Sequence, residues 1–292
     1  MSDGRFAIAL HGGAGARPGR DYSAEIAHMR ALAEAGRDRL RSGASALEVC
    51  VETTQALEAS GLYVAGRGSS PNAGGLYELD ASLMDGARRM IGAVAALQGF
   101  ESPVLAALDV MERTPHVMLA GEGAALFAGA QGLARITDPE AWFTRAGQGE
   151  ANHPPSMLAH GTVGCVVRDG DGRLCAATST GGVFGKMPGR VGDTPIPGAG
   201  VWADERVAVS CTGQGEYFLK VAAAAQVAFR ISLAGQALGE ASDAVLAEIA
   251  GLGGDGGLIA VDAQGRISTP FVSAGMKRAW ATADGDVGSA AF

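Results

Sequence analysis

The chain has 292 residues, of which 47% are hydrophobic and 18% charged, so it can bury a sizeable core and is not a disordered polymer. Its net charge of −8, without any cluster of Lys or Arg, argues against nucleic acid or an anionic membrane as partners. We see neither a signal peptide nor an apolar run approaching ~18 residues, which predicts a cytoplasmic protein without a membrane span. The four cysteines lack metal-binding spacing and are expected to be free, buried thiols.

Apolar periodicity, punctuated by Gly and Pro, predicts alternating strands and helices in the first half of the chain. A short apolar run enters the glycine loop at residues 11–15, which we interpret as a tight turn because phosphate-binding glycine motifs are absent. We interpret His11 in this loop as a structural histidine rather than a general base. Strands are expected at residues 6–10, 78–84 and 90–97, and helices at residues 23–42, 45–59, 103–113 and 122–130.

The periodicity is lost between residues 137 and 160, where polar residues and Pro154-Pro155 predict an exposed linker. Hairpin-linked strands and separate helices then favour antiparallel sheets. Two such sheets, packed face to face with helices outside, would form a four-layer αββα sandwich of the α+β class in a single domain. After the linker, strands are expected at residues 162–168, 173–178, 199–203, 207–211 and 257–262, and helices at residues 216–233 and 239–249.

The segment from residue 160 to residue 200 contains more glycine than strands require. Arg190 and Asp193 lie three residues apart among Gly and Pro, and hydroxyl groups gather at Thr162 and at residues 178–180. A set of capped β-turns would also explain this composition. The residues alone therefore leave both a structural and a catalytic interpretation open.

Short motifs along the whole chain resemble the plant-type L-asparaginase / isoaspartyl aminopeptidase family of N-terminal nucleophile hydrolases. They occur in order on both sides of the expected linker, so a chance match is negligible. The resemblance implies the same αββα fold that the element pattern predicts. The motifs are residues 8–15, ELDASLMDG at 78–86, PHVM at 115–118, GTVG at 161–164, TSTGG at 178–182, GRVGD at 189–193, CTGQGE at 211–216 and GGLIA at 256–260.

The resemblance implies that the precursor cuts its own backbone between Gly161 and Thr162, giving subunits of residues 1–161 and 162–292. Gly161 suits this step because it permits a strained backbone and leaves its carbonyl open to attack. Thr162 would then be the catalytic nucleophile, and its new α-amine, with an unperturbed pKa of about 7.7–8, the general base. Thr180 would supply a second hydroxyl beside the nucleophile, without any catalytic cofactor.

The resemblance also implies how a small substrate is held. Arg190 would bind the α-carboxylate through a bidentate guanidinium fork, and Asp193 would bind the α-ammonium group. Thr212 and Gly213 would donate to the oxyanion near a helix start, and Gly215 would complete the pocket floor. The expected substrates are L-asparagine and β-aspartyl dipeptides, both cleaved at the side-chain carbonyl to release L-aspartate.

Two further expectations follow from the resemblance alone. Cleaved αβ units are expected to form a homodimer. A structural sodium ion is expected on main-chain carbonyls, although an ordinary helix-to-loop turn explains the same stretch equally well. The residues matched to this sodium loop are Leu57, Glu58, Ser60, Tyr63, Ala65 and Arg67.

Three departures from the family pattern leave alternatives open. First, the expected linker is shorter than in the family's bacterial isoaspartyl peptidases. Second, Val64 stands where the family usually has an Asn near the pocket, and Asn72 could supply that hydrogen bond instead. Third, Gln214 fills the variable position of the Thr-Gly-x-Gly-Glu motif. A glycosylasparaginase is one alternative, but that enzyme typically has Asp in the place of Gly161. The other is a non-processing homologue that only binds.

Overall fold

The computed structural model describes residues 4–146 and 161–292, and its first sheet is built from both halves of the chain. Strands from the N-terminal and C-terminal halves alternate in this sheet, so neither half could complete it alone. Across the described residues the order is β12 (Val287–Ala290), β11 (Met276–Thr282), β1 (Ala7–Ala14), β5 (Val163–Arg168), β6 (Leu174–Thr180), β2 (Leu79–Asp85), β3 (Met90–Leu97) and β4 (Met118–Ala120).

A smaller second sheet packs on one face of the first, through contacts of β8 and β9 with β1 and β5. Its order among the described residues is β10 (Ile267–Ser268), β9 (Gly256–Asp262), β8 (Val207–Gly213) and β7 (Val201–Ala203). Two sheets of largely antiparallel strands thus lie face to face, as expected.

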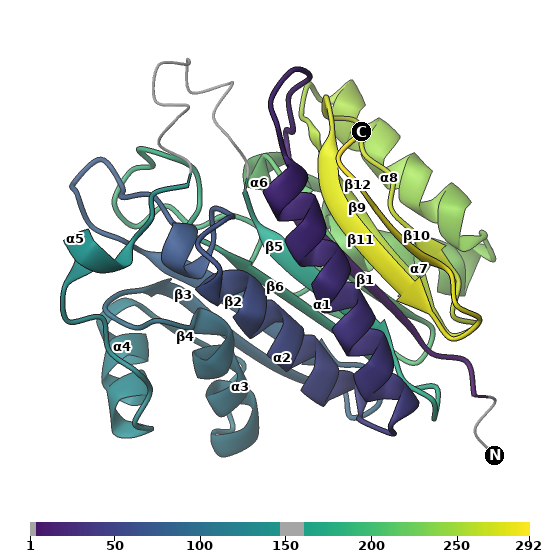
Figure 1. The fold of residues 1–292 in the computed structure, drawn as a ribbon, viewed down its shortest axis with the longest axis horizontal. Coiled ribbons are helices and arrows are strands. Elements are labelled where there is room, and N and C mark those ends of the chain that lie inside the picture. The colour runs from purple at the N-terminus through teal and green to yellow at the C-terminus, as the bar shows by residue number, and fades with distance from the viewer. Residues whose placement is uncertain (1–3, 147–160) are drawn as a thin grey trace.

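Helices cover the outer faces of both sheets, which confirms the predicted αββα sandwich (Figure 1). The first sheet is covered by α1 (Ser23–Arg41), α2 (Ala46–Ala59), α3 (Pro103–Arg113) and α4 (Gly121–Ala130). The second is covered by α7 (Ala223–Ala234) and α8 (Leu238–Gly251), with the short α6 (Gly215–Val221) beside them.

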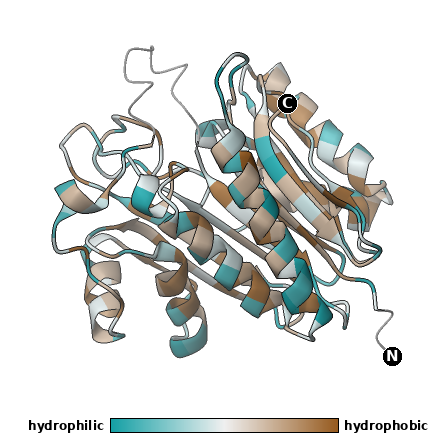
Figure 2. Cartoon of the chain, in the orientation of Figure 1, coloured by the Kyte–Doolittle hydropathy of each residue, from teal (hydrophilic) through white to brown (hydrophobic). Residues whose placement is uncertain are grey.

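Alternation along β1 shows how the layers form. Ile8 and Leu10 point into the core beneath α1 and α2, whereas Ala7 and Ala9 point into the core between the sheets. Small side chains let the two sheets approach closely, and larger ones anchor the helices. In Figure 2, hydrophilic residues recur along the outward side of α1 and α2, as expected for helices with one buried face.

Local sequence explains where several elements begin and turn. Ser45 accepts the backbone N–H of Glu48, whose side chain accepts the Ser45 N–H, so a capping box starts α2. Asp169 accepts the N–H groups of Asp171 and Arg173 and thereby closes the β5–β6 hairpin.

The linker expected over residues 137–160 is ordered in its first part. A helical turn, α5 (Pro139–Trp142), is capped by Asp138, and Phe143 is buried against the ring of Tyr77. Residues 137–141 are exposed, as expected, and the departure from the expected linker is local: Asp138-Pro139 starts a helical turn and Phe143 is buried because it finds an aromatic partner. Residues 147–160 of the expected linker lie outside the described part.

One helical stretch, Gly215–Ala234, is long and apolar enough to cross a membrane by length and composition alone, a test that the core helix of a soluble protein also passes. The single helix predicted at residues 216–233 is wrong, because Ala222 adopts φ +49° and divides α6 from α7. In the fold, α7 packs Ala224 and Val227 against the second sheet. This stretch therefore serves here as a covering layer of the sandwich.

Gly92 in β3 tests how closely α3 packs on the first sheet. A Cβ on Gly92 would lie 2.0 Å from the carbonyl oxygen of Ala107 and 2.7 Å from Cβ of Met111. We expect Gly92→Ala to lower the free energy of unfolding by about 1–3 kcal/mol, measured by urea denaturation. Gly123→Ala in α4 is the control, because its Cβ would meet no atom within 4 Å and alanine favours a helix by about 1 kcal/mol. Equal effects of the two substitutions would contradict this view of the packing.

Candidate active site

The register of the β5–β6 pair determines the centre of the site. Val163 pairs with Ser179, so Thr162 lies opposite Thr180 in the antiparallel ladder. The Thr162 hydroxyl donates to Oγ1 of Thr180 at 3.2 Å, and Thr180 Oγ1 also accepts the N–H of Gly182 at 3.0 Å. Both threonines are buried. The two hydroxyl groups that sequence matching proposed are therefore in direct contact.

His11 holds the backbone of Thr162 from the neighbouring strand. Its Nδ1 lies 3.0 Å from the Thr162 carbonyl oxygen, and its Nε2 lies 2.9 Å from Oγ of Ser210. Burial lowers the pKa of His11 to about 3, so the ring is neutral. A carbonyl can only accept, so Nδ1 carries the proton and Nε2 accepts from Ser210. Both ring nitrogens are satisfied, in agreement with a structural role for this histidine.

Gly161 fits against Val64 with no space to spare. A Cβ on Gly161 would lie 2.2 Å from Cβ of Val64, and the Val64 carbonyl accepts the N–H of Gly181 at 2.9 Å. Asn72 uses its side-chain oxygen within its own loop, accepting from the N–H groups of Gly74 and Leu76. Neither Asn72 nor Val64 is among the residues that line the pocket at Thr162, so Asn72 does not take the place of the family's Asn there.

The loop after β6 brings Arg190 and Asp193 to the same pocket as the threonines. In the intact chain the free volume of this pocket is about 10 Å³, close to the room that one water molecule needs. The pocket is lined by Gly161, Thr162, Thr180, Gly182, Val183, Arg190, Gly192, Asp193, Thr194, Gly213 and Gly215. The expected catalytic and substrate-binding residues thus line this pocket, except for Thr212.

Glu216 at the start of α6 orients Arg190, and we had not assigned it a role. Both Nε and Nη2 of Arg190 contact Oε1 of Glu216, at 2.9 and 2.8 Å. The arginine side chain is 17% exposed and the glutamate 55% exposed, so this pair lies at the mouth of the pocket. Its only sequence signal is the last position of the Thr-Gly-x-Gly-Glu motif.

Asp193 is the acidic side chain among the residues that line this pocket, and its pKa is raised. It is 4% exposed, and its Oδ2 has no hydrogen-bond partner within the described residues. Burial raises its pKa to about 7, and the nearby Arg190 lowers it. An unsatisfied carboxylate oxygen in a pocket is well suited to accept from an ammonium group of a ligand.

Glycines on β8 and α6 also line the pocket, and Gly215 packs directly against the loop that carries Asp193. Gly213 has φ +152°, and a Cβ there would lie 2.5 Å from the carbonyl oxygen of Asp255. A Cβ on Gly215 would lie 2.7 Å from Oδ1 of Asp193. The Thr212 hydroxyl accepts the N–H of Ala14 at 3.1 Å and so ties β8 to the glycine loop.

The carbonyl groups of the expected sodium loop can be examined one by one. Several already accept one hydrogen bond, but a carbonyl oxygen has two lone pairs, so each retains one for a hard cation. The carbonyl oxygens of Gly61 and Tyr63 lie 3.2 and 1.9 Å from where a Cβ on Gly68 would be, so this turn packs closely against a glycine. Main-chain carbonyls are a donor type that suits a hard cation. Four of the matched carbonyls accept a hydrogen bond: Leu57 from the Ser60 hydroxyl, Tyr63 from the Ala65 N–H, Ala65 from the Gly68 N–H, and Arg67 from the Thr144 N–H.

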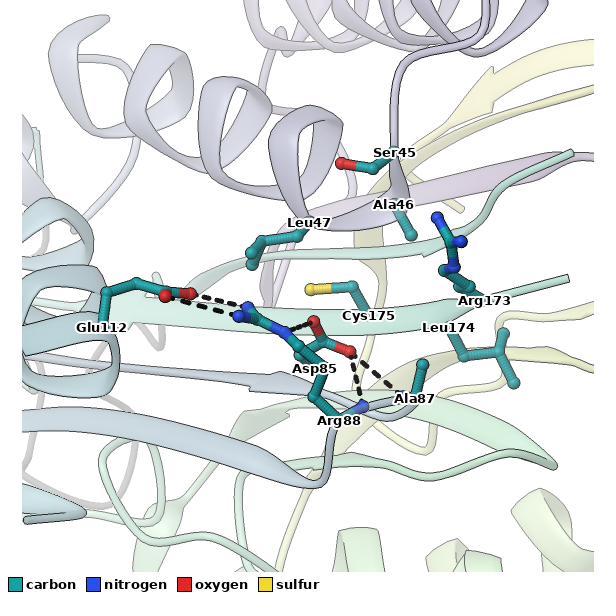
Figure 3. A pocket seen from close by; sticks show the side chains of 10 residues that line it. All are labelled: Ser45, Ala46, Leu47, Asp85, Ala87, Arg88, Glu112, Arg173, Leu174 and Cys175. Atoms are coloured by element: carbon teal, nitrogen blue, oxygen red, sulfur yellow. Dashed lines mark hydrogen bonds and ion pairs between the residues drawn. The ribbon is translucent and has the colours of Figure 1, made fainter. Parts of the chain in front are cut away.

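A larger pocket, of about 420 Å³, lies at the other end of β6 (Figure 3). Arg88 projects into it but is already paired with Asp85 and Glu112, as the dashed lines show. Cys175 also lines this pocket; its thiol is buried, and the pKa of that thiol is raised well above its usual value. The thiol that lines this pocket is therefore not activated.

Comparison with known proteins agrees with this geometry. A sequence model of a family described as asparaginase matches residues 4–289. The chain belongs to this asparaginase family. It is 45% identical over 295 residues to the isoaspartyl peptidase of Salmonella typhimurium, covering 94% of each chain. It is also 39% identical to the plant-type L-asparaginase of Pyrobaculum calidifontis, covering 94% of this chain and 96% of that protein. The family resemblance drawn from the motifs is confirmed.

For this asparaginase-family chain, the raised pKa of Asp193 predicts a pH-dependent cost to stability. The unfolded carboxyl ionises near pH ~4, and the buried one near pH 7. Between these values the folded state binds more protons, so stability falls as pH rises through this window. Asp193→Asn should therefore add about 1–4 kcal/mol more to the free energy of unfolding at about pH 8 than at about pH 4.

We would measure this difference by urea denaturation in a Thr162→Ala background, which keeps all chains intact. The control is Asp171→Asn, since the Asp171 side chain is 61% exposed. A gain from Asp193→Asn that is the same at both pH values would contradict the assignment.

Proposed function

We propose that this chain is a self-processing threonine hydrolase that cleaves the side-chain amide of L-asparagine and the isopeptide bond of β-aspartyl dipeptides, releasing L-aspartate. The observation that carries the proposal is one pocket holding the Thr162–Thr180 hydroxyl pair together with Arg190 and Asp193. The names of the relatives from Salmonella typhimurium and Pyrobaculum calidifontis support the same activity.

In this proposal the first reaction is the cleavage of the precursor between Gly161 and Thr162. The Thr162 hydroxyl adds to the Gly161 carbonyl carbon, and the C–N bond breaks as the acyl group moves from nitrogen to oxygen. Water then hydrolyses this ester, which gives a carboxylate on residues 1–161 and a free α-amine on residues 162–292. The free volume of about 10 Å³ in the intact pocket supports this order, because removing the Gly161 bond would make room for substrate.

The second reaction uses the new amine as the general base. It takes the proton of the Thr162 hydroxyl as the oxygen attacks the side-chain carbonyl carbon of the substrate. Donors at Thr212 and Gly213 would stabilise the oxyanion, and the protonated amine would protonate the leaving group. Water then hydrolyses the aspartyl ester on Thr162, so L-aspartate is released and the threonine is restored.

Recognition of both charged groups on the α-carbon of the substrate explains why only the side-chain bond is cut. Arg190, oriented by Glu216, would bind the α-carboxylate, and the free Oδ2 of Asp193 would accept from the α-ammonium group. A substrate held by both groups presents its side-chain carbonyl to Thr162, whereas an ordinary α-peptide lacks one of them. This arrangement also lets an acidic protein bind a zwitterion.

The remaining parts of the proposal come from the family. We propose a cytoplasmic homodimer of cleaved αβ units, without nucleic-acid or membrane partners. Size-exclusion chromatography with light scattering would test the dimer. A sodium ion on the carbonyls of the 57–67 loop would stabilise the chain; an unchanged melting temperature when choline replaces sodium would remove the ion from the proposal.

Cleavage can be tested with the nucleophile and with the residue before it. Thr162→Ala should leave the chain intact, whereas the parent should give pieces of 161 and 131 residues (292 − 161 = 131) by intact mass. Gly161→Ala should slow cleavage at least ~10-fold, about 1.4 kcal/mol in the barrier, because its Cβ clashes with Val64.

The matched rescue is Gly161→Ala combined with Val64→Gly, which removes both the Cβ and the methyl group that face position 161 and should restore part of the rate. Val64→Gly alone is the control. An intact parent chain after prolonged incubation would exclude self-processing, and a double variant as slow as Gly161→Ala would exclude the clash.

We expect β-aspartyl dipeptides to be better substrates than asparagine, because a larger leaving group adds contacts that can stabilise the transition state. The measurement is kcat/KM for β-Asp-Leu and for L-asparagine with fully cleaved protein. An equal or lower value for β-Asp-Leu would count against this preference. Faster release of the sugar from N4-(β-N-acetylglucosaminyl)-L-asparagine would instead favour a glycosylasparaginase.

A further inference from the structure

A lysine is buried directly behind the substrate pocket. The side chain of Lys186 is 1% exposed, and its ammonium group donates to the carbonyl of Glu78 at 2.9 Å. Nζ also lies 3.9 Å from Oδ2 of Asp80, a carboxylate that is fully buried. A Cβ on Gly182, which lines the pocket, would lie 3.0 Å from this ammonium group. The catalytic steps above make no use of this charge.

The two acids that face Lys186 are attached to other parts of the protein. Asp80 Oδ1 accepts the N–H of Ala96 at 2.7 Å, whereas its Oδ2 has no hydrogen-bond partner in the described part and faces Lys186. Burial raises the pKa of Asp80, and Lys186 lowers it. Glu78 is 5% exposed, and its two oxygens accept the N–H of Gly189 at 3.0 and 3.2 Å.

These contacts converge on the loop that carries the substrate-binding residues. The loop leaves β6 at Gly181, is held through Lys186 and Gly189, and then presents Arg190 and Asp193. Burying a charge costs several kcal/mol, and an apolar side chain could anchor the loop without that cost. The buried charge therefore points to a role beyond anchoring. Here the Lys186 ammonium group connects the loop to the segment before and at the start of β2, through the carbonyl of Glu78 and the carboxylate of Asp80.

We propose that Lys186, with Glu78 and Asp80, is a positioning cluster that sets the distance of Arg190 and Asp193 from Thr162 and thereby determines affinity for the zwitterionic end of the substrate. This inference rests on the proposed function. Lys186 acts through the loop and does not touch the reacting atoms. The nucleophile is held separately, by the β5–β6 ladder and by His11.

This separation predicts a specific kinetic effect of Lys186→Met, which removes the charge and retains an unbranched apolar side chain. The KM for L-asparagine should rise about tenfold or more, and the inhibition constant of the product L-aspartate should rise by the same factor. The kcat should stay within about threefold, because the threonine and its base are unmoved. Self-cleavage, followed by intact mass, should be as complete as in the parent.

The matched control is Lys220→Met, which removes the same charge from an exposed position in α6. Asp80→Asn keeps the shape and the acceptor for Ala96, and it should also raise both constants, even if Lys186→Met does not fold. The double variant Lys186→Met/Asp80→Asn should match Lys186→Met, since both act through one contact.

The outcomes separate this inference from the proposed function. Parent protein that is cleaved but releases no ammonia from asparagine would overturn the function itself. An active parent with an unchanged KM in both Lys186→Met and Asp80→Asn would overturn only the positioning role. A fall in kcat at constant KM would also overturn it, because that pattern indicates an effect on the nucleophile. A raised KM and inhibition constant with near-normal kcat supports it.

Discussion

The antiparallel register of β5 and β6 is the constraint on which the rest of the site depends. It places Thr162, just before β5, opposite Thr180 at the end of β6, and Asp169 closes the turn between the two strands. A shift by one residue would turn every side chain to the other face of the sheet and separate the hydroxyl groups. The core on both faces resists this shift, because Val166 packs between the sheets while Cys165 and Val167 pack beneath the helices.

Electrostatics in the pocket work against the stability of the chain. Asp193 is buried with one unsatisfied oxygen, and Lys186 and Asp80 are buried at a distance that gives an ion pair but no hydrogen bond. A buried carboxylate such as that of Asp193 is destabilising in an empty pocket and would become favourable once an ammonium partner binds. Lys186 and Asp80 lie behind the pocket, and burial of their charges costs folding free energy whether or not the pocket is occupied. Packing of the covering layers must offset both costs.

Sequence patterns predicted the features that depend on neighbouring residues. Strong periodicity gave the helix Pro103–Arg113 and the layers of the sandwich, and motif matching gathered Thr162, Thr180, Arg190 and Asp193. Contacts between distant segments had no local signal: His11 and Thr162 are 151 residues apart. The break at Ala222 was missed because neither Gly nor Pro marks it, and β11 and β12 were missed because only pairing with β1 gives Met276–Thr282 its place.

The contacts on the two sides of Thr162 show how one residue could serve the two proposed reactions. On its carbonyl side, His11 and the ladder to β6 fix the backbone, and these contacts do not involve the bond to Gly161. On its amide side lies Gly161, which packs against Val64. Breaking that bond would therefore release the amine and open the pocket while the hydroxyl stays beside Thr180. A nucleophile fixed before cleavage needs no rearrangement afterwards, so the geometry that would cut the precursor is also the geometry that would cut the substrate.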